Sequence, residues 1–368
     1  MNILLENGNV NPPFIEGTCN ILLNHAKELS ARGHNIVILT REKSIITGEK
    51  YLKYEEVGRI KFYRWSNYGD LFLIYKKIIK KEKIELIHIF SKGLRPFSYL
   101  WFLKNIIKKP IVFSSVGFPN TEKDSETDFR LKKNLRKKLI KFIKNVTIFT
   151  VTSKYLIEKD EIFKKENCLY LPYGIDTKRF SKKTNLKKTP KKIAYLRSPT
   201  ENLLNAFQKV LDLIPNTIFI FNKRYVEKNE KLAIFLKKNQ SRVLLIPEID
   251  DIANFFNEVQ FVIDVHDNTK YLECASPPLL LIEAMACETA VISTKMGEIE
   301  EFIEDGKNGF LLRDNNLETI YPIIKKAILS GTSVGKKARE TILKKYSISK
   351  IINLYEKLYY KLIKVKNG

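Results

Sequence analysis

The chain has 368 residues, of which 44% are hydrophobic and 29% charged, and its charged residues are spread along the sequence rather than gathered in low-complexity tails. This length exceeds one ordinary core, so a soluble protein of two domains is expected and a disordered chain is excluded. Lys and Arg number 65 against 41 Asp and Glu, a net charge of +24 that favours anionic partners. A general Lys-rich bias of the chain explains the same excess without any partner.

The first part of the chain alternates apolar runs of strand length with amphipathic stretches of helix length, the pattern of a parallel sheet covered by helices. Residues 2–6 are expected to form a strand, residues 18–33 a helix, and residues 35–40 the next strand, a βαβ unit. Further strands are expected at residues 60–65, 85–90, 110–115 and 146–152. Residues 1–180 are therefore predicted to be a Rossmann-like domain.

The second part of the chain repeats this alternation. Residues 181–192, SKKTNLKKTPKK, hold almost nothing to bury and are predicted to be a linker. Residues 193–345 are predicted to be a second Rossmann-like domain, and residues 346–368 a helix that packs back across the domains. Its buried strands are expected at 192–197, 216–221, 242–247, 259–265 and 290–294. The fold class is thus α/β, with two doubly wound parallel-sheet domains.

Cysteine usage and the N-terminus indicate the compartment. Cys19, Cys168, Cys274 and Cys287 are scattered without zinc-ligand spacing, so neither disulfides nor a structural metal are expected. The N-terminal apolar run is too short for a signal peptide, and no run reaches the length of a membrane span. The expected location is the cytoplasm, with any membrane contact peripheral and on the inner face of the cell membrane.

Residues 130–145, RLKKNLRKKLIKFIKN, form a basic amphipathic segment, and no acid occurs from residue 129 to 157. Two interpretations stay open. The apolar face packs on the first sheet and leaves a solvated basic back, or the helix lies on an anionic lipid surface. Docking on the sheet and contact with lipid do not exclude each other.

The stretch SPPLLLIEAMACETAVIST, residues 276–294, places one carboxylate, Glu283, among apolar residues. Ser276 is a good N-cap and Pro277 suits the first helical position, so a buried helix is expected from there to Cys287. A buried carboxylate costs several kcal/mol unless donors meet it. Either hydroxyl groups of a ligand or an ion pair with Lys295 would meet it, and both interpretations stay open.

These stretches together resemble one family. Residues 276–312 resemble the signature of the family 4 retaining glycosyltransferases, and residues 22–40, 85–90, 171–180 and 346–363 follow in that family's order. The resemblance implies the GT-B fold, with two Rossmann-like domains facing a cleft and a C-terminal helix that crosses back to the first domain. It also implies a hexosyltransferase-like enzyme that needs no metal or other cofactor.

The implied reaction moves a sugar from a nucleotide-sugar donor to an acceptor with retained anomeric configuration. Glu283 matches the family's ribose-binding Glu, Arg197 its phosphate-binding Arg, and Gly17 part of a glycine loop near the same phosphates. Cations and helix N-termini aimed at the departing diphosphate lower the barrier, so Arg197 and Glu283 are expected to carry catalysis. The other expected donor-binding residues follow strands or begin the helix: Lys223, His266, Ser276, Leu279 and Leu280.

Two positions that touch the sugar or the acceptor in the family depart from its pattern. The first of the family's paired glutamates falls on Ala275, with Glu273 two residues away. The family's His falls near Val116, which with Gly117 marks the acceptor side. Both groups are absent at the matching positions, which weakens the catalytic interpretation.

The phosphate loop departs as well. No Lys follows Arg197 in its loop, and Lys223 and Arg224 after the next strand are the expected substitutes. Glu288 and Glu298 stand where the family has Gly. Losing one transition-state contact commonly costs about 3 kcal/mol. A catalytically impaired sugar-nucleotide-binding homologue or regulatory partner is therefore the alternative to an active enzyme.

The preferred interpretation is a glycosyltransferase of glycan biosynthesis that acts on a glycan or a lipid-linked acceptor of the cell envelope. Its partners would be the nucleotide-sugar, the acceptor and an anionic membrane surface contacted through residues 130–145. Binding of nucleic acid is motivated only by charge, because the sequence has no stacking or groove-reading motif. No nucleic-acid partner is expected.

Overall fold

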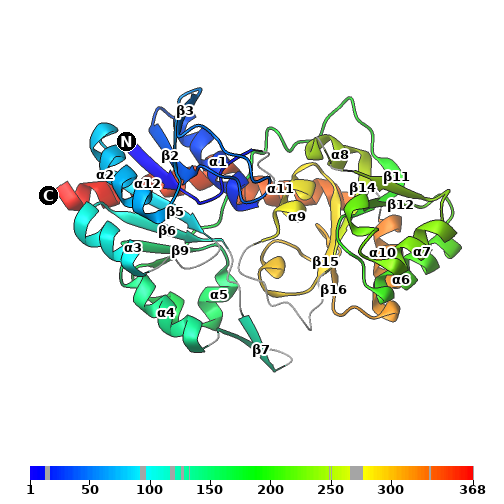
Figure 1. Cartoon of the computed structure of the whole chain (residues 1–368). Coiled ribbons are helices and arrows are strands. Elements are labelled where there is room, and N and C mark those ends of the chain that lie inside the picture. Colours follow the sequence, from blue (N-terminus) through cyan, green and yellow to red (C-terminus); the bar gives the residue numbers. More distant parts are fainter. Residues whose placement is uncertain are drawn as a thin grey trace. The chain divides into compact units, whose positions relative to one another are not determined.

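A computed structural model of the chain describes residues 1–12, 17–91, 97–116, 121–125, 128–131, 133–247, 249, 251–265, 277–330 and 333–367. The chain divides into two compact units (Figure 1). The first holds Met1–Ile175 and the C-terminal residues from Ile348 onward, and the second holds the described residues between Asp176 and Ser347.

The first unit is built on an eight-stranded sheet of order β10-β9-β6-β5-β1-β2-β4-β3. Neighbouring strands are parallel except β3 and β4, which pair antiparallel at one edge. The strands are β1 (Asn2–Glu6), β2 (Asn35–Arg41), β3 (Tyr54–Val57), β4 (Ile60–Trp65), β5 (Leu86–Ser91), β6 (Ile111–Ser115), β9 (Ile148–Val151) and β10 (Cys168–Tyr170). Because β1 lies inside the sheet and the chain proceeds to both sides of it, the predicted doubly wound topology is confirmed.

The helices of this unit lie between its strands in sequence, together with one short antiparallel hairpin. They are α1 (Gly17–Ala31), α2 (Tyr68–Lys81), α3 (Phe97–Phe102), the π-helix η1 (Leu103–Ile107), α4 (Lys133–Ile143), α5 (Lys154–Lys159) and the 3₁₀-helix η2 (Glu161–Lys164). The hairpin is β7 (Thr121–Ser125) and β8 (Asp128–Leu131).

Helix α4 contains most of the basic segment at residues 130–145, although residues 130 and 131 belong to β8. Its apolar side chains Leu139, Phe142 and Ile143 are buried. The Phe142 ring meets that of Phe113 on β6 edge to face, with centroids 4.5 Å apart. The basic side chains that follow Leu135 on the other sides of the helix are exposed: Arg136, Lys137, Lys138 and Lys141. Docking of the apolar face on the first sheet is therefore confirmed.

The second unit is built on a six-stranded parallel sheet of order β13-β12-β11-β14-β15-β16. The strands are β11 (Thr189–Tyr195), β12 (Ile218–Asn222), β13 (Val243–Ile246), β14 (Val259–Asp264), β15 (Ala290–Thr294) and β16 (Phe310–Leu312). Its helices are α6 (Glu201–Leu213), η3 (Lys223–Tyr225), α7 (Glu230–Lys238), α8 (Ile252–Glu258), α9 (Leu279–Ala286), η4 (Gly297–Glu301), α10 (Leu317–Leu329) and α11 (Ser333–Lys345).

Strand β11 begins inside the segment that the sequence analysis assigned to a linker. The residue before it, Lys188, anchors the segment, because its Nζ donates to the carbonyls of Phe256 (2.8 Å) and Val259 (3.2 Å) and to Thr289 Oγ1 (2.5 Å). Composition did not reveal this anchor, since a lysine among polar residues is ordinarily solvated.

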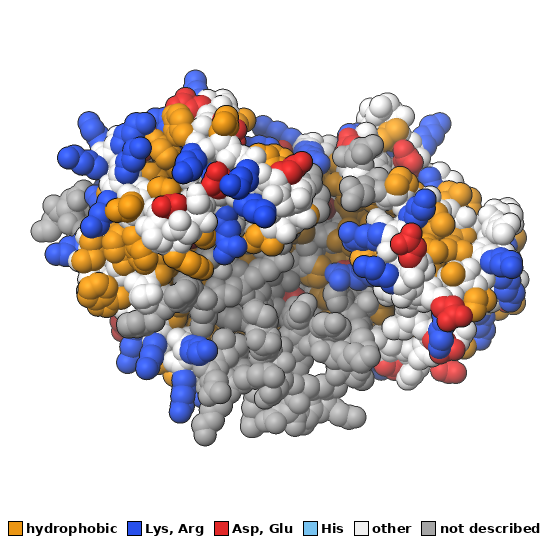
Figure 2. Space-filling view, in the orientation of Figure 1, with side chains coloured by type: hydrophobic (Ala, Val, Ile, Leu, Met, Phe, Trp, Pro, Cys, Tyr) orange, Lys and Arg blue, Asp and Glu red, His pale blue; other side chains and the backbone are white. Residues whose placement is uncertain are grey.

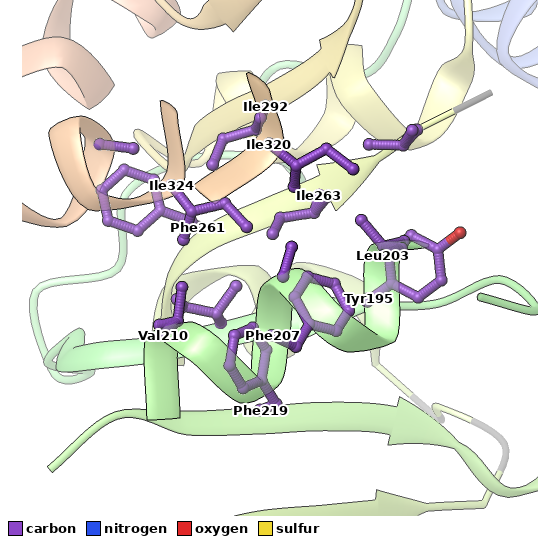
Figure 3. Packing of buried hydrophobic residues seen from close by; sticks show 14 of the residues in the cluster. Tyr195, Leu203, Phe207, Val210, Phe219, Phe261, Ile263, Ile292, Ile320 and Ile324 are labelled. Atoms are coloured by element: carbon purple, nitrogen blue, oxygen red, sulfur yellow. The ribbon is translucent and has the colours of Figure 1, made fainter. Parts of the chain in front are cut away.

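An aromatic core supports the second sheet (Figure 3). Phe207 of α6 packs on Phe219 of β12 with ring centroids 4.4 Å apart, and on Tyr195 of β11 at 5.7 Å. Isoleucines of α10 close the core above Phe261 of β14. Each fully buried side chain of this size contributes about 2 to 3 kcal/mol, so the strand ends behind the candidate site are rigidly held.

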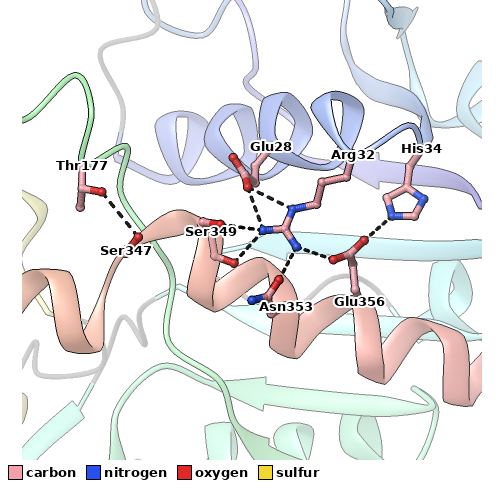
Figure 4. A network of polar contacts seen from close by, with 8 residues as sticks. All are labelled: Glu28, Arg32, His34, Thr177, Ser347, Ser349, Asn353 and Glu356. Atoms are coloured by element: carbon pink, nitrogen blue, oxygen red, sulfur yellow. Dashed lines mark hydrogen bonds and ion pairs between the residues drawn. The ribbon is translucent and has the colours of Figure 1, made fainter.

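Helix α12 (Ile348–Asn367) joins the first unit, as the predicted GT-B fold requires. Arg32, which follows α1, donates to Glu28 Oε1 (2.8 Å) and to the Ser349 carbonyl (2.8 Å), and also contacts Glu356 (Figure 4). Glu356 accepts a second contact from His34 Nε2 at 2.6 Å. This charged network fixes the outer side of α12 against α1.

The inner side of α12 inserts tyrosines into the first unit. The Tyr359 hydroxyl contacts His88 Nδ1 on β5, and His88 Nε2 lies 2.7 Å from Ser114 Oγ on β6. The Tyr355 hydroxyl lies 3.3 Å from the same Ser114 oxygen. Since these side chains are buried and hydrogen-bonded, α12 is an integral part of the core and not a loose tail.

Candidate functional site

The carboxyl edge of the second sheet gathers the residues predicted to bind a donor. Strand β11 begins the unit and lies between β12 and β14, so the order of the strands reverses between β11 and β14. Ligands of open α/β sheets bind outside the carboxyl ends of the strands at such a reversal. The residues that follow β11, β12 and β14 are therefore placed where a ligand is expected.

Arg197 follows β11 and crosses this reversal point to Asp264, the last residue of β14. Its Nε contacts Asp264 Oδ1, and its Nη2 lies 3.4 Å from Oδ2. Asp264 is fully buried, whereas the Arg197 side chain is 44% exposed. Burial lowers the pKa of Arg197, but the charge of Asp264 and its hydrogen bond together outweigh burial and raise that pKa above its ordinary value. The pair holds a permanently charged guanidinium at the edge with part of its surface open to a ligand.

Lys223 occupies the matching position on the neighbouring strand. Phe221 pairs with Tyr195 in the register of β12 and β11, so Lys223 and Arg197 each lie two residues beyond a paired position. Lys223 is exposed. The side chain of Asn222 accepts from the backbone N–H of Arg224 at 3.0 Å and fixes the turn. The structure thus brings the expected substitute for the missing loop lysine to the same edge as Arg197.

Arg224, the other expected substitute, is directed to its neighbour. Its Nη2 donates to the Tyr225 hydroxyl at 2.9 Å, and its guanidinium carbon lies 4.8 Å from the centre of the Tyr225 ring. This stacking holds Arg224 on the outside of the turn. Lys223 is accordingly the better substitute of the two.

Helix α9 begins later than predicted. Its N-cap is Pro278, with ψ of 120°, and the first helical residue is Leu279. A residue that precedes proline is pushed out of the helical region, so Pro277 is kept extended and the helix starts only after both prolines. The prediction of an N-cap at Ser276 and a helical Pro277 was wrong for this reason. The N–H groups of Leu279 and Leu280 have no acceptor among the described residues, as the first turn of a helix requires.

Glu283 lies in the middle of α9 and is half-buried. Loss of hydration raises the pKa of its carboxyl to about 7, and the charge of Arg179 offsets this rise only in part. The carboxylate has no hydrogen-bond or ion-pair partner within the described ranges. Lys295 pairs instead with Glu300 at 3.3 Å, where both side chains are about half exposed. The ion pair that was one of the two open interpretations of Glu283 is therefore not formed.

The end of α9 explains one departure from the family pattern. Glu288 follows the helix with φ of +58°, a left-handed conformation that favours glycine. The N–H of Thr289 donates back to the Ala284 carbonyl at 3.0 Å and closes the helix end. A glycine at this position would adopt the same turn without the steric conflict of a Cβ.

Replacing Glu288 by glycine is expected to raise the free energy of unfolding by about 1 kcal/mol, because a left-handed conformation costs other residues roughly that much. Urea denaturation of the full chain measures the change. Glu227→Gly is the matched control, since Glu227 is exposed and lies outside the left-handed region. An equal or opposite effect in the Glu288 variant would show that the turn is not strained.

The other predicted residues lie in the first unit or outside the described residues. Gly17 is the first residue of α1, and Val116 directly follows β6, where its N–H donates to the Ser91 carbonyl at 3.0 Å. The predicted positions outside the described residues are Gly117, His266, Glu273, Ala275 and Ser276. In the described part of the chain, no group of three or more His, Cys, Asp or Glu side chains is arranged to hold a metal ion.

Two residues of the site were missed by sequence reasoning. Asp264 ends a predicted strand, but nothing in the sequence tied it to Arg197, which precedes it by 67 residues. Arg179 lies within residues 171–180, LPYGIDTKRF, which resemble the family, and its positive charge lowers the pKa of Glu283. Two features of the sequence could have pointed to these residues. Asp264 lies at the end of a predicted strand, and Arg179 lies in a segment that resembles the family.

Comparison with known proteins places both units in one family. Residues 176–346 match the model described as Glycosyl transferases group 1, and residues 17–151 match Glycosyl transferase 4-like. N-acetyl-alpha-D-glucosaminyl L-malate synthase of Bacillus anthracis is 25% identical over 391 aligned positions, which cover 97% of each chain. Poly(ribitol-phosphate) alpha-N-acetylglucosaminyltransferase of Staphylococcus aureus is 34% identical over 87 residues, or 22% of this chain and 17% of that protein.

Solved structures show the same fold at lower identity. Sucrose-phosphate synthase from Thermosynechococcus elongatus superposes with a TM-score of 0.71 and 14% identity over 99% of both chains. HepE of Anabaena, solved with UDP and glucose, superposes with a TM-score of 0.65 and 15% identity, over 97% of this chain and 99% of that one. Two parallel-sheet α/β domains of this kind form the GT-B fold.

Proposed function

Because this chain belongs to the GT4-type glycosyltransferases of GT-B fold, we propose that it transfers a sugar from a nucleotide-sugar to an acceptor hydroxyl with retained anomeric configuration. The observation that carries the proposal is the half-buried carboxylate of Glu283, which has no partner among the described residues. A group of this kind is costly to fold unless a ligand meets it. The ribose hydroxyls of a nucleotide are donors of the right chemistry.

The remaining residues of the edge suit the leaving group. In the transfer, the bond from the anomeric carbon to the donor phosphate oxygen breaks, and the nucleoside diphosphate leaves with the electron pair. The acceptor oxygen bonds to the anomeric carbon, and its proton passes to the departing diphosphate. Arg197 and the N–H groups of Leu279 and Leu280 offer positive charge to the departing diphosphate, with Lys223 as a second cation.

A residue-based mechanism of this kind needs no metal, which agrees with what the family resemblance predicts. The positive charge that a metal supplies in other phosphate sites would come here from Arg197 and Lys223. Activity that is unchanged in the presence of EDTA would support this assignment. Activity that is lost with the chelator and restored by Mg²⁺ would contradict it.

Thermal-shift screening against UDP-, GDP- and ADP-sugars tests donor binding. The relatives supply the first choices, because the Bacillus anthracis enzyme is named for an N-acetylglucosaminyl group and L-malate, and HepE was solved with UDP and glucose. UDP-N-acetylglucosamine and UDP-glucose are therefore tested first, with L-malate and lipid-linked glycans as acceptors. The anomeric proton coupling of the product reports retention or inversion.

Turnover separates an active enzyme from the catalytically impaired homologue that the departures at Ala275 and Val116 suggest. Donor hydrolysis or transfer with any acceptor supports the enzyme. Binding of a nucleotide-sugar without either reaction across a wide acceptor set would favour the impaired binder. Failure to bind any nucleotide would contradict both.

An anionic membrane surface is the further partner that we propose, in contact with the basic back of α4. Figure 2 shows apolar side chains gathered on the face of the first unit that carries α3, with Lys and Arg side chains beside them. Trp101 of α3 is 50% exposed and Ile106 of η1 is 47% exposed. Lys104 Nζ donates to the carbonyl of Lys144 at 3.0 Å, which ties η1 to the residue that follows α4. Exposed apolar residues next to a basic helix suit an interfacial contact.

Neutralising α4 is expected to weaken membrane binding. Each Lys near an anionic surface contributes about 1 kcal/mol, so Lys137→Gln with Lys141→Gln should lower partitioning roughly tenfold or more in a flotation assay with phosphatidylglycerol vesicles. Lys336→Gln with Lys337→Gln is the matched control, since both are exposed on α11 of the second unit. No difference between the pairs, or equal binding to phosphatidylcholine vesicles, would contradict the contact. Among the described helices, none is long and apolar enough to cross a membrane.

A further inference from the structure

Arg41 is an arginine without a partner at the carboxyl edge of the first sheet. It ends β2 and lies opposite Trp65, the last residue of β4, in the register of the two strands. Its guanidinium carbon is 5.0 Å from the centre of the Trp65 ring. Arg41 Nε and Trp65 Nε1 are both buried and donate to no acceptor within the described ranges. Two strong donors thus lie together without an acceptor.

A neighbouring buried arginine of the same unit, Arg64, is satisfied. Arg64, which neighbours Trp65, donates to Asn11 Oδ1 (2.9 Å) and the Leu52 carbonyl (2.8 Å), and it pairs with Glu55. Buried donors that lack a partner cost about 1 to 3 kcal/mol each, and native proteins keep few of them. Other buried donors of the described residues, such as Thr18 Oγ1, also lack a partner, but among these donors only Arg41 carries a permanent charge, and a charged donor favours an anionic acceptor.

The acids around Arg41 are engaged elsewhere. The carboxylate of Glu42, the next residue, accepts from the Ser66 hydroxyl. That hydrogen bond, with the charges of Lys50 and Lys53, lowers the pKa of Glu42. Glu55 is taken by Arg64. Neither carboxylate pairs with Arg41, although Glu42 keeps its negative charge.

The surroundings of Arg41 place it on the ligand side of the sheet. The residues that follow β1 pack on the end of β2: Val10 donates its N–H to Thr40 Oγ1 (2.8 Å), and the Asn11 amide donates to the Arg41 carbonyl (2.9 Å). In doubly wound sheets this edge, next to the turn after the first strand, is where ligands bind. The first unit also holds Val116, which the family resemblance places on the acceptor side.

We propose that Arg41, seated on the face of Trp65, binds an anionic group, a carboxylate or a phosphate, carried by the acceptor. A guanidinium presents two parallel N–H groups to such an oxyanion, and the Trp65 ring on which it is stacked holds the guanidinium in place. The binding of an oxyanion rests on the contacts around Arg41 alone. That the oxyanion belongs to the acceptor rests on the proposed function.

The two tryptophans of the chain make the test direct. The chain holds only Trp65 and Trp101, so the indole N–H region of a ¹⁵N–¹H spectrum shows one signal for each. Titration of the full chain with inorganic phosphate and, separately, with L-malate is expected to shift the Trp65 signal and leave that of Trp101 in place. The anion that gives the larger shift at the lower concentration identifies the chemistry of the group.

Arg41→Gln is expected to weaken that binding roughly tenfold to a hundredfold, the range for hydrogen bonds between charged groups. Arg41→Lys keeps the charge without the paired N–H groups, so its affinity for the anion should lie between those of the parent chain and Arg41→Gln. Arg59→Gln is the matched control, because Arg59 is exposed in the turn before β4. Since the Arg41 side chain makes no hydrogen bond or ion pair with the described residues and only stacks on Trp65, Arg41→Gln should unfold near the temperature of the parent chain.

The site is overturned if neither anion moves the Trp65 signal, if Arg41→Gln responds as the parent does, or if that variant unfolds well below Arg59→Gln. Nucleotide binding keeps this result separate from the proposed function. Apart from Gly17, the described residues expected to bind the nucleotide lie in the second unit, and Arg41 is not among them, so UDP affinity should be nearly the same in Arg41→Gln. Anion binding by a chain that binds no nucleotide would support the site and refute its link to an acceptor.

Discussion

Replacing Glu283 by alanine is expected to weaken nucleotide-sugar binding by roughly tenfold to a hundredfold, the worth of hydrogen bonds from neutral hydroxyls to a carboxylate. The fold should change little, because the carboxylate has no partner to lose among the described residues and its burial already raises its pKa to about 7. Isothermal titration with the best donor of the screen measures the affinity, and urea denaturation measures the stability.

Glu340→Ala is the matched control, because Glu340 is exposed on α11 of the same unit. Equal donor affinity in Glu283→Ala and the parent chain would contradict the assignment of ribose binding. A loss of stability larger than the loss of binding free energy would contradict it as well, because the carboxylate would then serve the fold and not the ligand.

The raised pKa of Glu283 also predicts how stability depends on pH. The carboxyl of Glu283 has a pKa of about 7 in the folded state, against the ordinary value of 4.5 in the unfolded chain, so the folded state binds this proton more tightly. The extra stability is fully present below pH 4.5 and is lost as the pH rises through 7. In Glu283→Gln, the free energy of unfolding should fall less as the pH rises, by up to about 3 kcal/mol. Donor that binds the ionised form should protect the parent chain most above pH 7.

Most of the fold follows from local patterns. Apolar runs of strand length predicted the inner strands of both sheets, because a buried parallel strand must be apolar on both faces. The edge strands β3, β10 and β16 were not predicted. The edge strand β3 was missed because its sequence, YEEV, carries two acids and is largely exposed. The start of α9 was misplaced because each proline was weighed singly, whereas two in succession keep the first one extended.

The site was predictable in its residue types but not in its pairings. A buried Glu283 was expected, yet only the structure shows that Lys295 turns to Glu300. The partner of Arg197 lies on another strand, and the sheet order that brings Asp264 beside it is a tertiary property. Arg41 illustrates the limit best, because a strand-end arginine is ordinary in sequence and becomes informative only when its partners are counted.

Replacing Arg197 by alanine is expected to lower kcat by roughly a hundredfold to a thousandfold, the usual loss when one donor to a developing anion is removed. The same change is expected to destabilise the second unit by about 3 kcal/mol or more, because it removes the guanidinium from a fully buried carboxylate, that of Asp264. A single variant therefore mixes a catalytic effect with a structural one. Steady-state kinetics and urea denaturation are needed on the same preparation.

The double variant Arg197→Ala with Asp264→Asn separates the two effects. Asparagine keeps the shape of Asp264 without its charge, so most of the lost stability should return while kcat stays low, since the Arg197 cation no longer faces the diphosphate. Recovery of kcat together with stability would show that Arg197 acts only by neutralising Asp264. Arg197→Lys should keep part of both properties, because an ammonium supplies charge but cannot bridge the two carboxylate oxygens as the guanidinium does. The order of kcat among these variants decides whether Arg197 takes part in the reaction or only stabilises the second sheet.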